Sequence, residues 1–268
     1  MSQRAESRAP IRKTGARAVL VSFSGIDGAG KSTQINHLVD FIRQSGAEPA
    51  VISFWDHVVA LRKLREFTSH SVFKGEKGVG SPDRPVRRRD KNVRSRLMTL
   101  ARCAFYLLDA LNINLVLSRF RSKYDVLIFD RYLYDELANL PLTCAFLRMY
   151  VRLLLRLAPR PDVPYLLDAD PQKAIERKPE YPLDFVVLNR LAYLSLATEM
   201  GSMVVIGAGP EEAVHAQVLQ AIIGMLDKHL SQHSMPPSHR SLKGLHMVRR
   251  ANEDLSGNHI SAESRGLE

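Results

Sequence analysis

The chain has 268 residues, of which 45% are hydrophobic and 25% charged, so it can bury one sizeable core and needs no second domain. Its two cysteines, Cys103 and Cys144, stand far apart without paired Cys/His spacing, which disfavours a disulfide framework or a structural metal site. The formal net charge of +10 comes from residues 1–17 (+4) and 74–96 (+6), so the rest is near neutral and we expect no specific nucleic-acid-binding face.

The first predicted element is a β-rich run over residues 18–24, followed by a glycine-rich turn and a helical pattern over 31–44. A second strand over 50–54 and a short helix over 58–68 come next. Residues 75–92 contain three glycines, two prolines and the run R-R-R-D-K. We expect them to form a loop, longer than is usual inside a compact domain.

The second half of the chain continues the alternation of strands and helices. The predicted elements are a helix over 95–118, a strand over 125–129 ending at Asp130, a helix over 143–157, a strand over 163–167, helices over 171–177 and 183–200, a strand over 203–206 and a helix over 210–230. This order predicts an α/β fold with a doubly wound, five-stranded parallel sheet and helices on both faces.

The two ends of the chain are expected to lie outside the folded domain. We predict one domain over residues 18–230, a disordered basic tail over 1–17 and a disordered polar tail over 231–268. The most apolar-looking stretch, residues 140–157, is interrupted by three arginines, so no transmembrane segment is expected. With no apolar leader at the N-terminus, a cytoplasmic location is the default expectation.

Residues 25–32 read G-I-D-G-A-G-K-S and fit the phosphate-binding pattern G-x-x-x-x-G-K-[ST] without a mismatch. The pattern lies between a predicted strand and a predicted helix, as a phosphate loop requires. Its backbone N–H groups would wrap the phosphates, Lys31 would reach the β and γ groups, and the Ser32 hydroxyl would bind magnesium. The expected ATP-binding residues are Gly25, Asp27, Gly28, Ala29, Gly30, Lys31, Ser32 and Thr33.

A phosphate loop also needs a carboxylate on a neighbouring strand to hold its magnesium ion. The run V-L-I-F-D at 126–130 is an apolar strand that ends in Asp130. The next residue, Arg131, is of a phosphate-binding type. ATP and Mg²⁺ are therefore the expected cofactors.

At these motifs the sequence resembles the thymidylate kinase family. The family's F-x-G-x-D-G-x-G-K-[ST]-T-Q reads here F-S-G-I-D-G-A-G-K-S-T-Q (residues 23–34), and its Asp-Arg-Tyr at a strand end is D-R-Y at 130–132. The stretch L-L-D-A-D-P-Q-K-A-I-E-R (166–177) looks like the family's strand and the start of its lid. The resemblance covers about residues 18–230 and implies a P-loop nucleoside monophosphate kinase fold.

The resemblance also implies roles for individual residues. Asp27 would face the sugar hydroxyl of the acceptor, Asp130 would orient magnesium or its water, and Arg131 would hold the transferring or acceptor phosphate. Members of the family place a catalytic arginine either in the phosphate loop or in the lid. Because Gly28 stands at the loop position, a short lid over 177–183 would supply it, with Arg177 as the first candidate and Lys178 as the second.

The acceptor side departs from the family pattern. F-W-D-H-V-V stands at 54–59 where an Arg-Glu-Pro-Gly-Gly-Thr type of segment is expected, and Asp135 replaces a serine after D-R-Y. In the long helix, Asp109 stands near the position of a base-gripping arginine. Trp55 ends a strand at the carboxyl edge of the sheet, so it either lines the acceptor pocket or belongs to the core. The predicted acceptor-binding residues are Asp27, Trp55, Tyr106, Asp109, Arg131, Tyr132 and Asp135.

Three functions stay open. The first is a nucleoside monophosphate kinase that acts on nucleotide substrates, with dTMP as first choice. The second is a kinase of the same fold for another acceptor, such as a sugar or glycan precursor, and the third is a nucleotide-binding protein with little turnover. A homodimer and an acidic partner for the basic loop 74–96 also stay open. A GTPase is disfavoured because the chain has no Asn-Lys-x-Asp motif.

Overall fold

The computed structural model describes residues 17–59, 96–140 and 145–232. The predicted loop at 75–92, most of the predicted helix at 58–68, and the tails other than Arg17 and residues 231–232 lie outside the described residues, as does Cys144. The elements, in chain order, are β1 (Val19–Ser24), α1 (Lys31–Gln44), β2 (Pro49–Ser53), the π-helical turn η1 (Phe54–Val58), α4 (Arg96–Phe120), β3 (Val126–Asp130), α5 (Leu133–Leu137), α6 (Ala145–Leu157), β4 (Val163–Asp168), α7 (Pro171–Arg177), α8 (Leu183–Met200), β5 (Val204–Gly207) and α9 (Glu211–Gln232).

The strands form one five-stranded parallel sheet in the order β2-β3-β1-β4-β5. The central strand β1 pairs with β3 on one side and β4 on the other. Five of its six residues are buried, as expected of a strand that is covered on both faces. The predicted fold class is confirmed.

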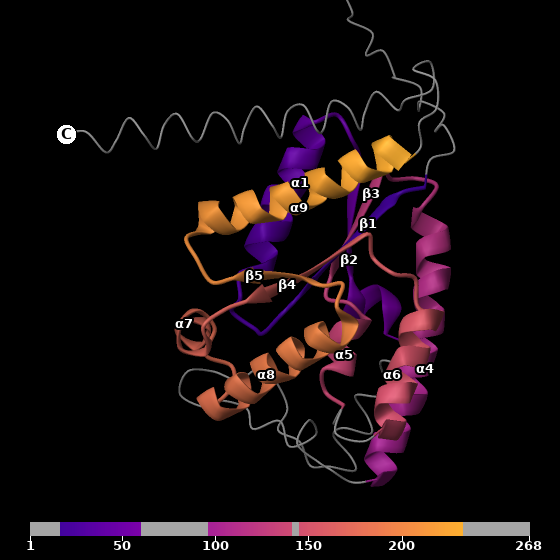
Figure 1. Ribbon diagram of the computed structural model, residues 1–268, viewed down its shortest axis with the longest axis vertical. Coiled ribbons are helices and arrows are strands. Elements are labelled where there is room, and N and C mark those ends of the chain that lie inside the picture. The colour runs from indigo at the N-terminus through magenta and orange to yellow at the C-terminus, as the bar shows by residue number, and fades with distance from the viewer. Residues whose placement is uncertain (1–16, 60–95, 141–144, 233–268) are drawn as a thin grey trace, which may run out of the picture.

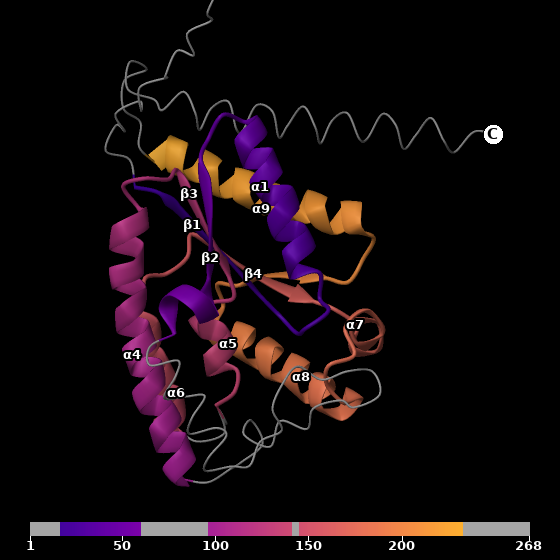
Figure 2. The same cartoon turned by 180° about the vertical axis from the view of Figure 1, so that it is seen from behind.

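Helices cover both faces of the sheet and enclose two cores (Figures 1 and 2). Leu20 points into the core beneath α4, α5, α6 and α8, whereas its neighbour Val21 points into the core beneath α1 and α9. This alternation is the period of two that a strand imposes on its side chains. All of the parallel strands end at the same edge of the sheet, where the phosphate loop and α7 lie.

The predicted boundaries agree with the structure within two residues for most elements. The predictions for α1, α7 and α8 match both ends. The sequence analysis missed α5, because five residues are too few to show a helical period. It also missed η1, which follows β2 directly.

Within the described part of the chain, one helical segment, Thr99–Phe120 in α4, is long and apolar enough to cross a membrane by length and composition. This segment differs from residues 140–157, the apolar-looking stretch that three arginines interrupt. Core helices pass the same test, and α4 packs against α5, α6 and η1. The segment is therefore weak evidence for a membrane span.

Candidate active site

Two glycines let the phosphate loop pass close to the backbone of neighbouring elements. Gly25 has a φ of 141°, and a Cβ there would lie 2.5 Å from the carbonyl oxygen of Leu167 in β4. Gly28 has a φ of 82°, and a Cβ would lie 2.2 Å from the carbonyl oxygen of Ala174 in α7. Both conformations disfavour any other residue. In this arrangement position 28 has no room for the arginine that some thymidylate kinases carry in the loop.

Lys31 begins α1 and is 7% exposed. Its Nζ donates hydrogen bonds to the carbonyl oxygens of Gly25 (2.9 Å) and Ile26 (2.8 Å), so the side chain lies against the loop. Burial, followed by the nearby positive charge of Arg131, lowers the pKa of Lys31 from 10.5 to about 8. The carboxylates of Asp27, Asp135 and Asp130 act in the opposite direction, so Lys31 lies among both positive and negative groups.

Asp130 lies at the carboxyl end of β3, beside Phe23 of β1 in the sheet register. Among the residues that the structure describes, no hydrogen bond or ion pair engages its carboxylate, which acts electrostatically on Lys31 and Arg131. Ser32 is exposed in the first turn of α1. One available carboxylate and one hydroxyl fit Mg²⁺, which keeps most of its ligands as water and phosphate oxygens. No group of three or more His, Cys, Asp and Glu that could hold a metal occurs in the described ranges.

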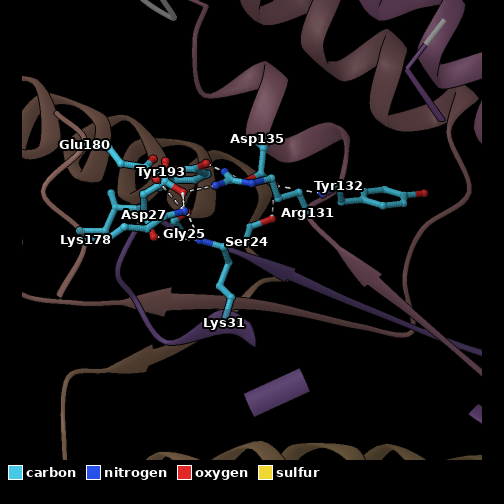
Figure 3. A network of polar contacts seen from close by, with 11 residues as sticks. Ser24, Gly25, Asp27, Lys31, Arg131, Tyr132, Asp135, Lys178, Glu180 and Tyr193 are labelled. Carbon is cyan, nitrogen blue, oxygen red and sulfur yellow. Dashed lines mark hydrogen bonds and ion pairs between the residues drawn. The ribbon is translucent and has the colours of Figure 1, made fainter. Parts of the chain in front are cut away.

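Arg131 connects the phosphate loop to the start of α5 (Figure 3). Its Nη2 donates to Oδ1 of Asp27, and its Nη1 donates to Oδ1 of Asp135 at 3.2 Å. Burial opposes the charge of the guanidinium, but the two carboxylates outweigh it and raise the pKa of Arg131. Lys178 Nζ lies 3.9 Å from the same oxygen of Asp27 and 3.2 Å from Glu180 Oε1, so the lid segment also reaches the loop.

Asp135 lies at the centre of a buried polar network. Oδ2 accepts hydrogen bonds from the Ser24 hydroxyl (2.7 Å) and the Tyr132 backbone N–H (3.0 Å). Oδ1 accepts from Arg131 and from the hydroxyl of Tyr193 (2.7 Å), which comes from α8. These contacts join β1, α5 and α8 at the carboxyl edge of the sheet.

The lid candidate Arg177 reaches the phosphate loop. Its Nη1 donates to the carbonyl oxygen of Gly28 at 3.1 Å, across the contact between the loop and α7. Asp170 caps α7 by accepting from the N–H groups of Gln172 and Lys173. A guanidinium at this position lies beside the loop that would hold the phosphates, and the catalytic role of Arg177 stays a prediction.

The predicted acceptor residues are not all brought together. Trp55 is 39% exposed in η1, beyond the carboxyl end of β2, and can contact a ligand. Tyr106 and Asp109 are buried within α4. The Tyr132 ring points away from the phosphate loop (Figure 3), and its hydroxyl donates to the carbonyl oxygen of Pro159. The geometry therefore gives no support to Tyr132 as an acceptor ligand.

Sequence reasoning missed Ser24 and Tyr193 as members of the site. Ser24 occupies a variable position of the family's longer pattern over residues 23–34, and Tyr193 lies among apolar residues of a helix, where a tyrosine indicates core packing. Each contacts Asp135 across a large sequence separation, 111 residues for Ser24 and 58 for Tyr193. No local sequence pattern predicts a contact between residues so far apart in the chain.

No protein-family model matches the chain. A curated relative from Archaeoglobus fulgidus, named a probable thymidylate kinase, is 24% identical over 216 residues, which is 78% of this chain and 97% of the relative. The solved structure of a thymidylate kinase from Candida albicans aligns with a TM-score of 0.52 and 19% identity, covering 81% of this chain and 95% of that one. The resemblance seen in the motifs is thus confirmed: in sequence and fold the chain is thymidylate kinase-like.

Proposed function

We propose that the protein is a kinase that transfers the γ-phosphoryl group of ATP, with magnesium, to a nucleoside monophosphate, with dTMP as first choice. The observation that carries this proposal is the phosphate loop between β1 and α1, in which Lys31 is buried against the loop carbonyl oxygens and Arg131, from the end of β3, donates to Asp27. The likeness to the two thymidylate kinases supports the same reaction class.

The roles that we propose are those predicted from the motifs and from the family resemblance. The phosphate-loop backbone and Lys31 hold the β and γ phosphates, while Arg131 and Arg177 neutralise charge on the transferring group. Ser32 and Asp130 would hold magnesium, which supplies further charge neutralisation when it is bound. Transfer is direct and in line, so positioning of the two substrates accounts for most of the rate enhancement.

The acceptor itself is the least constrained part of the proposal. Tyr106 and Asp109 are buried in α4, and Asp135 is held by four donors within the protein. These observations favour keeping a second candidate, a kinase of the same fold that acts on a different small phosphorylated acceptor. We propose that Trp55, which is 39% exposed, and Asp27 contact the acceptor.

One acceptor panel tests these alternatives. ADP release from ATP is measured with dTMP, the other nucleoside monophosphates and several sugar phosphates, with and without Mg²⁺. We expect turnover with dTMP, loss of turnover without Mg²⁺, and a loss of at least about 100-fold in folded Lys31→Ala protein. Turnover with a non-nucleotide only would favour the second candidate. Wild-type activity in Lys31→Ala would remove the kinase assignment, and no turnover with any acceptor would favour a nucleotide-binding protein.

A further inference from the structure

We propose that Asp135 and Tyr193 are positioning residues that hold the Arg131 guanidinium toward the phosphate loop. This inference rests on the proposed function, in which Arg131 binds phosphate. It also changes the role that the sequence resemblance gave to Asp135, from contact with the acceptor to control of an arginine that makes that contact (Figure 3).

Arg131 needs partners that hold it in place because its backbone adopts an unfavourable conformation. Its φ of 65° is the one positive value at a non-glycine residue in the described ranges. The left-handed region is unfavourable for side chains with a Cβ, and such strain persists where the surroundings fix it. Here the Arg131 N–H donates to the carbonyl oxygen of Phe23 (3.0 Å), and the guanidinium lies between Asp27 and Asp135.

The hydrogen bonds of Asp135 explain why it positions Arg131 and does not itself bind substrate. Asp135 is 5% exposed, and each of its carboxylate oxygens accepts two hydrogen bonds from protein donors. A carboxylate has about four accepting positions, so all of them are used. A hydroxyl of an acceptor could enter only by displacing one of these donors.

Tyr193 fixes the oxygen that Arg131 uses. Burial, and next the charge of Asp135, raise the pKa of Tyr193, so its hydroxyl stays protonated and donates. It shares Oδ1 with Arg131, and removal of the hydroxyl would leave this oxygen free to move with the guanidinium. Tyr193 also lies on α8, which begins directly after the lid segment, so the network links the lid side of the site to Arg131.

Tyr193→Phe removes the hydroxyl and keeps the ring. We expect kcat to fall about tenfold with an unchanged KM for ATP, because Arg131 is displaced while the phosphate loop is not. Tyr165→Phe is the matched control: Tyr165 is also buried, and its hydroxyl donates to the carbonyl oxygen of Val218 (2.6 Å) in the core beneath α1 and α9. We expect it to lower Tm by a similar amount and to leave kcat unchanged.

A double-mutant cycle tests whether the loss of kcat in Tyr193→Phe acts through Arg131. If Tyr193 acts through Arg131, Tyr193→Phe should cost little further activity in an Arg131→Lys background, whereas a general loss of stability would cost as much in both. Additive losses, or an equal loss of kcat in Tyr165→Phe, would overturn the proposal.

A second readout does not depend on catalysis. NMR of the arginine side chains should show the Arg131 N–H signals in slow exchange with water in the wild type and in Tyr165→Phe, and in faster exchange in Tyr193→Phe and Asp135→Asn. Unchanged exchange in both site variants would also overturn the proposal. If the wild-type protein turns over no acceptor, the proposed function fails, but this measurement still decides whether the network holds Arg131.

Discussion

At the scale of single residues, the charge of Lys31 depends on what occupies the phosphate loop. In the structure its ammonium group is buried against two carbonyl oxygens, and a nearby arginine opposes its charge. Phosphate oxygens would replace those neutral partners with negative charge. The bound nucleotide should therefore raise the pKa of Lys31 from about 8 back toward its ordinary value.

This coupling predicts a pH dependence of nucleotide binding. Because the bound form holds the proton more tightly than the free form, affinity for ATP should be constant well below pH 8 and should fall as pH rises above it, by up to about tenfold per unit. Calorimetry near pH 9 in two buffers of different ionisation enthalpy should show proton uptake on binding. An affinity that stays flat between pH 7 and pH 10 would show that Lys31 does not titrate in this range.

Individual residues of the site differ in how far the sequence could predict them. Lys31 belongs to a pattern whose spacing is set by phosphate chemistry, and Asp130 ends an apolar run that is typical of a buried strand, so both positions could be predicted from local sequence. Asp135 was placed in the site from the resemblance, but its role depends on partners from β1 and α8. Burial and hydrogen-bond saturation are three-dimensional properties, and only the structure reveals them.

At the scale of elements, the contact between the phosphate loop and α7 is the tightest constraint on the site. Gly28 brings the loop against the last turns of a helix whose final residue, Arg177, bonds back to the loop. A side chain at position 28 would have to displace backbone atoms of α7. The same displacement would move Arg177 away from the phosphates.

Gly28→Ala should therefore impair catalysis through α7. We expect the free energy of unfolding to fall by about 1–3 kcal/mol and kcat to fall at least tenfold, because Ala174 must shift. Gly46→Ala is the matched control: Gly46 has a φ of 79° but no atom within 4 Å of an added Cβ, so it carries the backbone strain without the clash. Chemical denaturation and steady-state kinetics on both variants measure the two effects. Equal losses of stability and kcat in the two variants would show that backbone strain, and not the clash with α7, causes the effect.

The elements themselves were more accessible to sequence reasoning than the site network. Long segments with a clear period, such as α1 and α8, could be predicted at both ends because glycine or proline marks their limits. The short α5 could not, although it carries Asp135. The stretch that positions the key carboxylate is therefore the one with the weakest local signal.

At the scale of the whole molecule, positive charge is concentrated at two places in the sequence. Residues 1–17 and 74–96 account for the net charge of +10, and the chain between and after them is close to neutral. Nearly all of both stretches lies outside the described residues. A dense basic segment attracts an acidic acceptor or partner over a distance that salt shortens.

The basic stretch 74–96 should make binding of an acidic acceptor sensitive to salt. If its cations contact several phosphates or a charged surface, the acceptor KM should rise steeply above about 0.1 M ionic strength, where the Debye length is roughly 10 Å. Replacing Arg87, Arg88 and Arg89 together with glutamine should raise that KM at low salt and flatten its salt dependence. ATP binding serves as the internal control and should stay unchanged, because in our proposal Lys31 and the loop backbone hold the nucleotide. Wild-type acceptor kinetics in the triple variant at low salt would leave a small nucleotide as the favoured acceptor, held by the site alone.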